Sequence, residues 1–110
     1  MKKNPSLEAN LKAAKTAIHE MMRHWHLWKR ALEKDDQEEA LAGYVAALTC
    51  CKVFIENYLK HLYPHEKNMP LKVSHDIKKL ISEFDVIEKA NEKKLHHALT
   101  QIDMLSKDAA

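Results

Sequence analysis

Two short polar clusters hold the side chains that are best suited to chemistry. Glu56 and Lys60 stand four residues apart in an apolar stretch, and a proline-bearing loop separates them from the run Ser74, His75 and Asp76. An ammonium and an imidazole facing one cleft could bind the phosphates of a nucleotide or of RNA. A structural interpretation stays open, because Glu56 and Lys60 also form a favourable i, i+4 pair and Asp76 suits the first turn of a helix.

The histidines and cysteines offer other chemistry, which their spacing does not support. The chain has eight histidines, but only Glu20 and His24 form a well-placed acid and histidine pair on one helix. Cys50 and Cys51 are adjacent, and a disulfide between neighbouring helical positions would be strained. We interpret both cysteines as small buried residues in a reducing compartment, and so expect a cytoplasmic protein with no metal and no cofactor.

A basic face is predicted along the first helix, where cationic residues recur every three or four positions. Its members are Lys12, Lys15, His19, Arg23, His26 and Arg30. Such a line attracts phosphate backbones through the release of counterions, although the solvent side of any amphipathic helix has a similar pattern. The formal net charge of the whole chain is only +2. RNA binding by this face is therefore one hypothesis, and an ordinary solvent-facing side of an amphipathic helix is the alternative.

Alternating spacings of four and three predict a first helix over about residues 6–34. Its apolar positions are Leu7, Leu11, Ala14, Ile18, Met21, Trp25, Trp28 and Leu32. This heptad rhythm is typical of helices that pack nearly parallel or antiparallel. Because both tryptophans lie on the apolar stripe, we expect them to fill a core or a dimer seam rather than stack on bases.

A second helix is predicted after the acidic pair Asp35 and Asp36, with Glu38 and Glu39 in its first turn. It runs to about Tyr63, where Pro64 ends it. Several apolar residues lie outside its heptad stripe, namely Ala47, Cys50, Phe54 and Leu59. The apolar arc is therefore wider than one neighbouring helix needs. Such a helix is usually the central one of a bundle, or it meets a second copy of the protein.

A third helix is predicted to begin at Ser74 as the N-cap, with Asp76 in its first turn. Its apolar register slips by one position at Asn91. The slip indicates either a locally unwound supercoil or a break between two helices, with Asp85 or Asn91 as the new cap. Three helices and four helices are both compatible with the pattern.

Length and composition predict one all-α domain over residues 1–110, an up-and-down bundle of three long helices of which the last is continuous or broken in two. The chain is 45% hydrophobic and 31% charged, and one glycine and three prolines are too few for a β-sandwich or a phosphate-binding loop. A domain of 110 residues is marginal alone, so we expect a homodimer. No stretch resembles a signal peptide or a membrane span, and we expect no membrane association.

The two polar clusters carry a resemblance to a known family. The stretch Glu56-Asn57-Tyr58-Leu59-Lys60 and the later Ser74-His75-Asp76-Ile77 resemble the HEPN domains (higher eukaryotes and prokaryotes nucleotide-binding) over about residues 25–85. Those domains show an apolar helix ending in Glu-x-x-Leu/Ala-Lys and a next helix starting Thr/Ser-His-Asp-Leu. The resemblance implies a dimeric helical bundle that binds nucleotide or RNA, or partners a minimal nucleotidyltransferase in a toxin–antitoxin pair. The family's ribonuclease motif is missing, because neither Arg23 nor Arg30 is followed by a histidine after four to six residues.

Two functional hypotheses follow from these patterns. The first is a non-catalytic, dimeric HEPN-like module with Glu56, Lys60, His75 and Asp76 as ligand-binding residues and no catalytic residue. The second is a helical protein-binding adaptor, immunity or inhibitor protein without a nucleic-acid role, which uses the wide apolar arc of the second helix. No phosphate loop, zinc-protease motif or nucleophile elbow is present, so we do not expect an enzyme.

Overall fold

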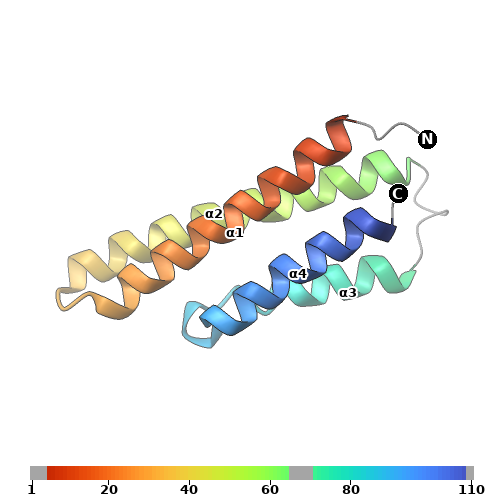
Figure 1. Ribbon diagram of the computed structural model, residues 1–110. Helices are drawn as coiled ribbons and strands as arrows, with labels where there is room; N and C mark the ends of the chain where they lie inside the picture. The colour runs from red at the N-terminus through yellow and green to blue at the C-terminus, as the bar shows by residue number, and fades with distance from the viewer. Residues whose placement is uncertain (1–4, 65–70, 109–110) are drawn as a thin grey trace.

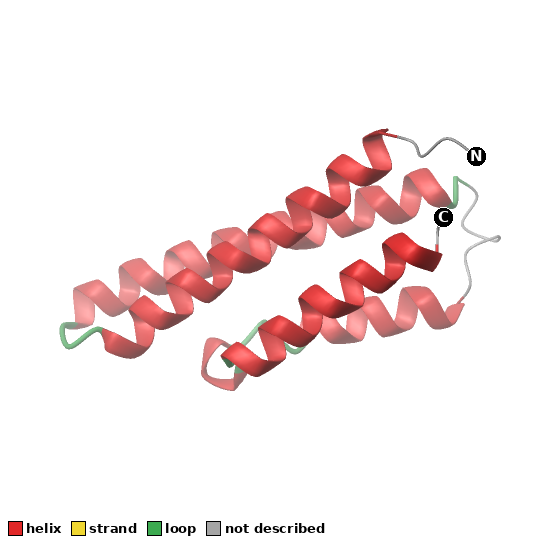
Figure 2. Cartoon of the chain, in the orientation of Figure 1, coloured by secondary structure: helices red, strands yellow, loops and turns green. Residues whose placement is uncertain are grey.

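A computed structural model describes residues 5–64 and 71–108, and every regular element in these ranges is a helix (Figure 2). The four α-helices are α1 (Pro5–Arg30), α2 (Lys34–Leu62), α3 (Leu71–Ser82) and α4 (Glu92–Asp108). A short 3₁₀ helix, η2 (Ile87–Lys89), lies between α3 and α4. The prediction of an all-helical protein is confirmed. Parts of the predicted loop, residues 65–70, lie outside the described residues.

Helices α1 and α2 form a long antiparallel pair joined by a tight turn, and α3 and α4 form a shorter pair alongside (Figure 1). Helix α1 ends at Arg30, before the predicted end near Lys34. Glu33 has an extended backbone as the N-cap of α2, whose first turn holds Asp35 and Asp36. Negative charge is stabilising at that end of a helix. Leu32 therefore lies in the turn with 97% of its surface exposed, and its predicted place in the core is wrong.

The second half of the chain is broken into two helices. Ser74 lies inside α3, which begins at Leu71 after Pro70, so its predicted role as N-cap and the first-turn position of Asp76 are wrong. The break comes where the apolar register slips. There the side chain of Asn91 accepts a hydrogen bond of 2.8 Å from the backbone N–H of Lys94, which is the geometry of an N-cap. The alternative with four helices, and with Asn91 as the new cap, is confirmed.

One hydrophobic core joins the two helix pairs. It contains Leu11, Ala14, Ile18 and Met21 of α1 and the buried positions of α2, with Tyr44, Tyr58 and Phe84 among its largest fully buried side chains. The hydroxyl of Tyr44 donates a hydrogen bond of 2.7 Å to the carbonyl oxygen of Phe84, which follows α3. Burial, with a smaller contribution from the charge of Asp85, raises the pKa of Tyr44 above its usual range. Trp25 and Trp28 are half-buried against the same core, as their heptad positions predict.

The adjacent cysteines point to different environments. Cys51 is buried in the core, where burial and then the neighbouring Cys50 raise the pKa of its thiol to about 12. Cys50 is exposed, so the prediction that both cysteines are buried is wrong for Cys50. The reason is geometric, because adjacent helical positions diverge by about 100° and only one of them can face the core.

The hydrogen bond of Tyr44 predicts a specific loss of stability. Tyr44→Phe leaves the buried carbonyl oxygen of Phe84 without its donor, and we expect the free energy of unfolding to fall by about 1–2 kcal/mol. Urea denaturation followed by circular dichroism measures this change. Tyr63→Phe is the matched control, because Tyr63 is half-buried and nothing in the described chain hydrogen-bonds to its hydroxyl. Equal stabilities of Tyr44→Phe and the wild type would contradict the inferred role of the bond.

Candidate functional site

The residues predicted to bind a ligand lie on two helices and face solvent. On α2, the ammonium of Lys60 lies 3.6 Å from the carboxylate of Glu56, and their side chains are 69% and 66% exposed. On α3, His75 and Asp76 are exposed while Ile77 next to them is buried. The exposed i, i+4 pair contributes only about 0.2–0.5 kcal/mol to the stability of the helix. Nothing in these contacts requires a ligand.

A pocket of about 280 Å³ lies between α2 and α3, close to these residues. Its lining residues are Lys52, Ile55, Glu56, Leu59, Ile77, Lys78, Ile81 and Ser82. Glu56 is the one predicted ligand-binding residue among them, and Lys60, His75 and Asp76 are not part of the lining. The ammonium of Lys52, at the same pocket, is held 2.6 Å from Asp85. The four predicted residues therefore remain a hypothesis without a common pocket in the described chain.

Acidic residues partly neutralise the basic face of α1. Lys15 forms an ion pair of 2.7 Å with Asp103 of α4, and the imidazole of His26 lies 3.8 Å from Glu92 at the start of α4. These two members of the face therefore connect α1 to α4. The ammonium of Lys15 is not available to a phosphate without the loss of this internal contact.

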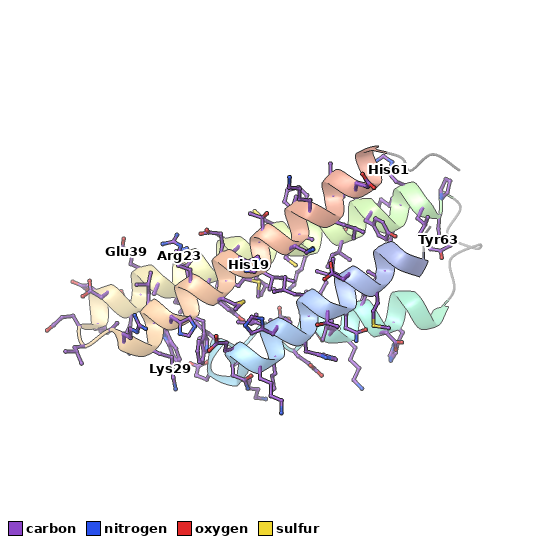
Figure 3. All side chains as sticks on the ribbon, in the orientation of Figure 1. His19, Arg23, Lys29, Glu39, His61 and Tyr63 are labelled. Carbon is purple, nitrogen blue, oxygen red and sulfur yellow. The ribbon has the colours of Figure 1, made fainter. Side chains whose placement is uncertain are left out.

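A third member, Arg23, is paired within α1 itself. Its guanidinium donates a hydrogen bond of 2.9 Å to Glu20, and this bond, with the charge of Arg23, lowers the pKa of the Glu20 carboxyl. Figure 3 shows Arg23 of α1 and Glu39 of α2 on the same side of the α1–α2 pair. They line a pocket of about 540 Å³ together with Arg30, His24 and Asp36, so the cations there face acids.

Lys12, His19 and Arg30 are the members of the basic face that have no ion pair with another described residue. Lys12 and His19 are exposed on α1. Arg30, which is also exposed, ends the helix near Asp36 and Glu39 in the pocket described above. Two separated cations, Lys12 and Arg30, are a weaker electrostatic attraction for nucleic acid than the line of six basic residues that the sequence predicts.

The surface of α2 that points away from the rest of the chain is unusually apolar. No charged residue occurs between Glu39 and Lys52. We call six exposed residues in and just after this stretch the outer face of α2: Ala42, Val45, Ala46, Thr49, Cys50 and Val53. Leu41, which is also exposed, lies one turn before Val45 at the margin of this surface. The hydroxyl of Thr49 donates to the carbonyl oxygen of Val45 at 2.9 Å, so it makes its hydrogen bond within the helix. The wide apolar arc predicted for this helix therefore includes a surface that the described chain does not cover.

A shallow groove adjoins the outer face where α2 meets α1. It has a volume of about 550 Å³. Most of its lining residues are small or apolar: Ala9, Ala13, Thr16, Ala17, Ala47, Cys50 and Phe54, with Lys12 and Glu20 beside them. Cys50 belongs to both surfaces. Sequence reasoning identified the wide arc but not this groove, because the pairing of α1 with α2 creates it.

Helices α1 and α2 approach closely where His24 meets Gly43. A Cβ atom added to Gly43 would overlap the imidazole ring of His24, so the close contact depends on glycine at this position. The Nδ1 atom of His24 is buried without a hydrogen-bond partner in the described chain. His24 also lies 3.8 Å from Glu20. The prediction that this is the only acid and histidine pair on one helix is wrong, because Glu92 and His96 of α4 form a second one at 3.7 Å. No group of three His, Cys, Asp or Glu residues in the described ranges could hold a metal ion.

The contact between His24 and Gly43 predicts a non-additive effect on stability. Gly43→Ala improves the helix propensity of α2 by about 1 kcal/mol, but overpacking against the imidazole costs about 1–3 kcal/mol. We expect Gly43→Ala to destabilise the wild type by about 1 kcal/mol and to stabilise the His24→Ala variant by a similar amount. Thermal unfolding of the four proteins measures both changes. Equal stabilisation in both backgrounds would show that the ring does not restrict this position.

Searches of protein-family models, curated proteins and solved structures found no match to this chain. None of the described helices is both long enough and apolar enough to cross a membrane. The resemblance to HEPN domains stays a prediction from the two polar clusters. Inferences about function therefore rest on the surfaces and contacts described above.

Proposed function

We propose that this chain is a non-catalytic helical module that acts by binding protein through the outer face of α2. The observation that carries the proposal is the uncharged stretch Ala40 to Cys51, much of which is exposed on a protein with 31% charged residues. Val45 and Val53 on this surface are each 47% exposed. Contiguous exposed apolar surface commonly marks a contact site for another protein. An amphipathic helix that lays its apolar side on this surface is the simplest partner, and a second copy of the chain is one such partner.

The arrangement of polar groups supports binding rather than catalysis. The pocket between α2 and α3 has walls of Ile55, Leu59, Ile77 and Ile81, and its lining includes no histidine or cysteine. The exposed Cys50 lies on an apolar surface, whereas reactive thiols usually sit in electropositive surroundings. In the described chain, no nucleophile is hydrogen-bonded to a histidine or a carboxylate that could serve as its base.

Nucleotide or RNA binding is the second candidate. The resemblance of Glu56, Lys60 and the run from Ser74 to Asp76 to HEPN domains supports it. So do the basic residues Lys12, His19 and Arg30, which form no ion pair with another described residue. The ion pairs of Lys15, Arg23 and His26 weigh against it. In this candidate the chain works beside a minimal nucleotidyltransferase in a toxin–antitoxin pair.

Matched surface variants test the proposed function. Val53→Asp places a charge on the outer face of α2, whereas Val86→Asp places the same charge at an equally exposed position outside it, because Val53 is 47% and Val86 45% exposed. Purified from its native cells, the wild-type chain should carry a stoichiometric protein partner, or a second copy of itself. Val53→Asp should lose that partner and Val86→Asp should keep it. Equal retention or equal absence in all three proteins would contradict the proposal.

Calorimetry separates the two candidates. If the chain acts by binding protein, titration with ATP and with a short single-stranded RNA should give no heat of binding at low salt. The second candidate would instead be established by ATP or RNA binding that weakens with added salt. Val53→Asp should then preserve this binding, and the double variant Lys12→Glu with Arg30→Glu should abolish it. Circular dichroism of each variant checks that the helices are retained.

A further inference from the structure

The described chain is more extended than a globule of its length. Its radius of gyration is 15.0 Å, with principal extents of 51, 24 and 21 Å, whereas a compact chain of this size has a radius of about 13 Å. An elongated pair of helix hairpins leaves much of the long helix α2 at the surface. The outer face of α2 runs along the middle of that helix, and the described residues leave it uncovered.

Building on the proposed function, we infer that the partner is a second copy of this chain, with the two α2 helices packed antiparallel through their outer faces. Exposed positions along α2 recur at alternating steps of four and three: Asp35, Glu39, Ala42, Ala46, Thr49, Val53, Glu56 and Lys60. The spacing of this series, though not its residue types, is the same from both ends, and its midpoint lies between Ala46 and Thr49. A two-fold interface requires such a self-complementary surface. An antiparallel copy places Ala42 opposite Val53 and Ala46 opposite Thr49.

Charge selects the antiparallel direction over the parallel one. The first turns of α2 hold four acidic residues and one lysine, in the segment Lys34 to Glu39. The other end holds Lys52, Lys60 and one acid, Glu56. An antiparallel pair brings Asp35 of one copy to Lys60 of the other, and it also opposes the two helix dipoles. A parallel pair would place the two acidic ends together, where like charges repel.

The same antiparallel register sets Glu39 of one copy near Glu56 of the other. The carboxylate of Glu56 is 3.6 Å from the ammonium of Lys60 in the same copy. This positive charge offsets the repulsion between Glu39 and Glu56. Small side chains at the centre of the surface, Ala42 and Ala46, allow the two helices to approach to the short end of the usual 8–10 Å range. A nucleic acid would find no cation between Glu39 and Lys52, so phosphates are not a fitting occupant of this surface.

Sedimentation equilibrium of the full chain tests the inference. The wild type should sediment at twice its chain mass of 12.8 kDa. Val53→Asp should raise the dissociation constant at least tenfold, because it buries a charge in each half of a two-fold seam, whereas Val86→Asp should leave the dimer unchanged. Circular dichroism verifies that both variants keep their helices. A wild type that is monomeric at high micromolar concentration, or a dimer that resists Val53→Asp, would overturn the inference.

Charge reversal tests the direction of packing. Lys60→Asp should weaken the dimer by about fivefold at low salt, since two exposed ion pairs of about 0.5 kcal/mol each are lost. Adding Asp35→Lys should recover part of this loss, because it re-forms the two pairs between the copies but not the contact of Glu56 with residue 60. Lack of rescue would contradict the antiparallel register.

Cross-linking tests the same register. A bis-maleimide with a short spacer should join the exposed Cys50 of one copy to that of the other, and the absence of a covalent dimer would count against the register.

Two outcomes separate self-association from binding of a different protein through the outer face of α2. A monomeric wild type that binds a different protein, and loses it in Val53→Asp but not in Val86→Asp, would overturn the second copy as partner and would leave the proposed function standing. A monomeric wild type without any partner sensitive to Val53→Asp would overturn both.

Discussion

The packing of α1 against the inner side of α2 is the interaction on which the rest of the structure depends. Heptad residues such as Ile18, Met21 and Leu48 fill the space between these helices and are almost completely buried. Once that side of α2 is covered, Tyr44 and Lys52 hold the segment after α3 against a neighbouring strip of α2, through Phe84 and Asp85. Lys15 joins α1 to α4 and does not contact α2 in this way. The opposite side of α2 therefore stays exposed although it is apolar.

The sequence predicts the elements of this fold well because long helices have a strong periodic signal. The heptad stripes predicted α1 and α2, and the register slip together with Asn91 predicted the break before α4. Boundaries were harder to predict, since Leu32 continues the stripe of α1 but lies in the turn, and Ser74 resembles a cap but lies within α3. The acidic start of α2 follows directly after Leu32, and α3 already begins at Leu71, before Ser74.

The candidate sites were less predictable, for reasons that lie in tertiary contacts. The basic face is regular in sequence, but its neutralisation depends on acids such as Asp103 and Glu92, which are distant in the chain and close in space. Likewise, spacing alone does not show whether His75 faces α2 or solvent. The wide apolar arc of α2 was visible in the sequence, whereas the part of it left uncovered emerges only when α1 and α3 are in place.

A dilution series followed by two-dimensional ¹H–¹⁵N nuclear magnetic resonance is the sharpest test of self-association through the outer face of α2, because it reports each backbone amide separately in the unmodified protein. If the outer face of α2 binds a second copy, amide signals from the residues along that face should shift as the protein is diluted, while those of α4 should stay in place. Signals that do not change with concentration, or changes concentrated on α4, would contradict the account.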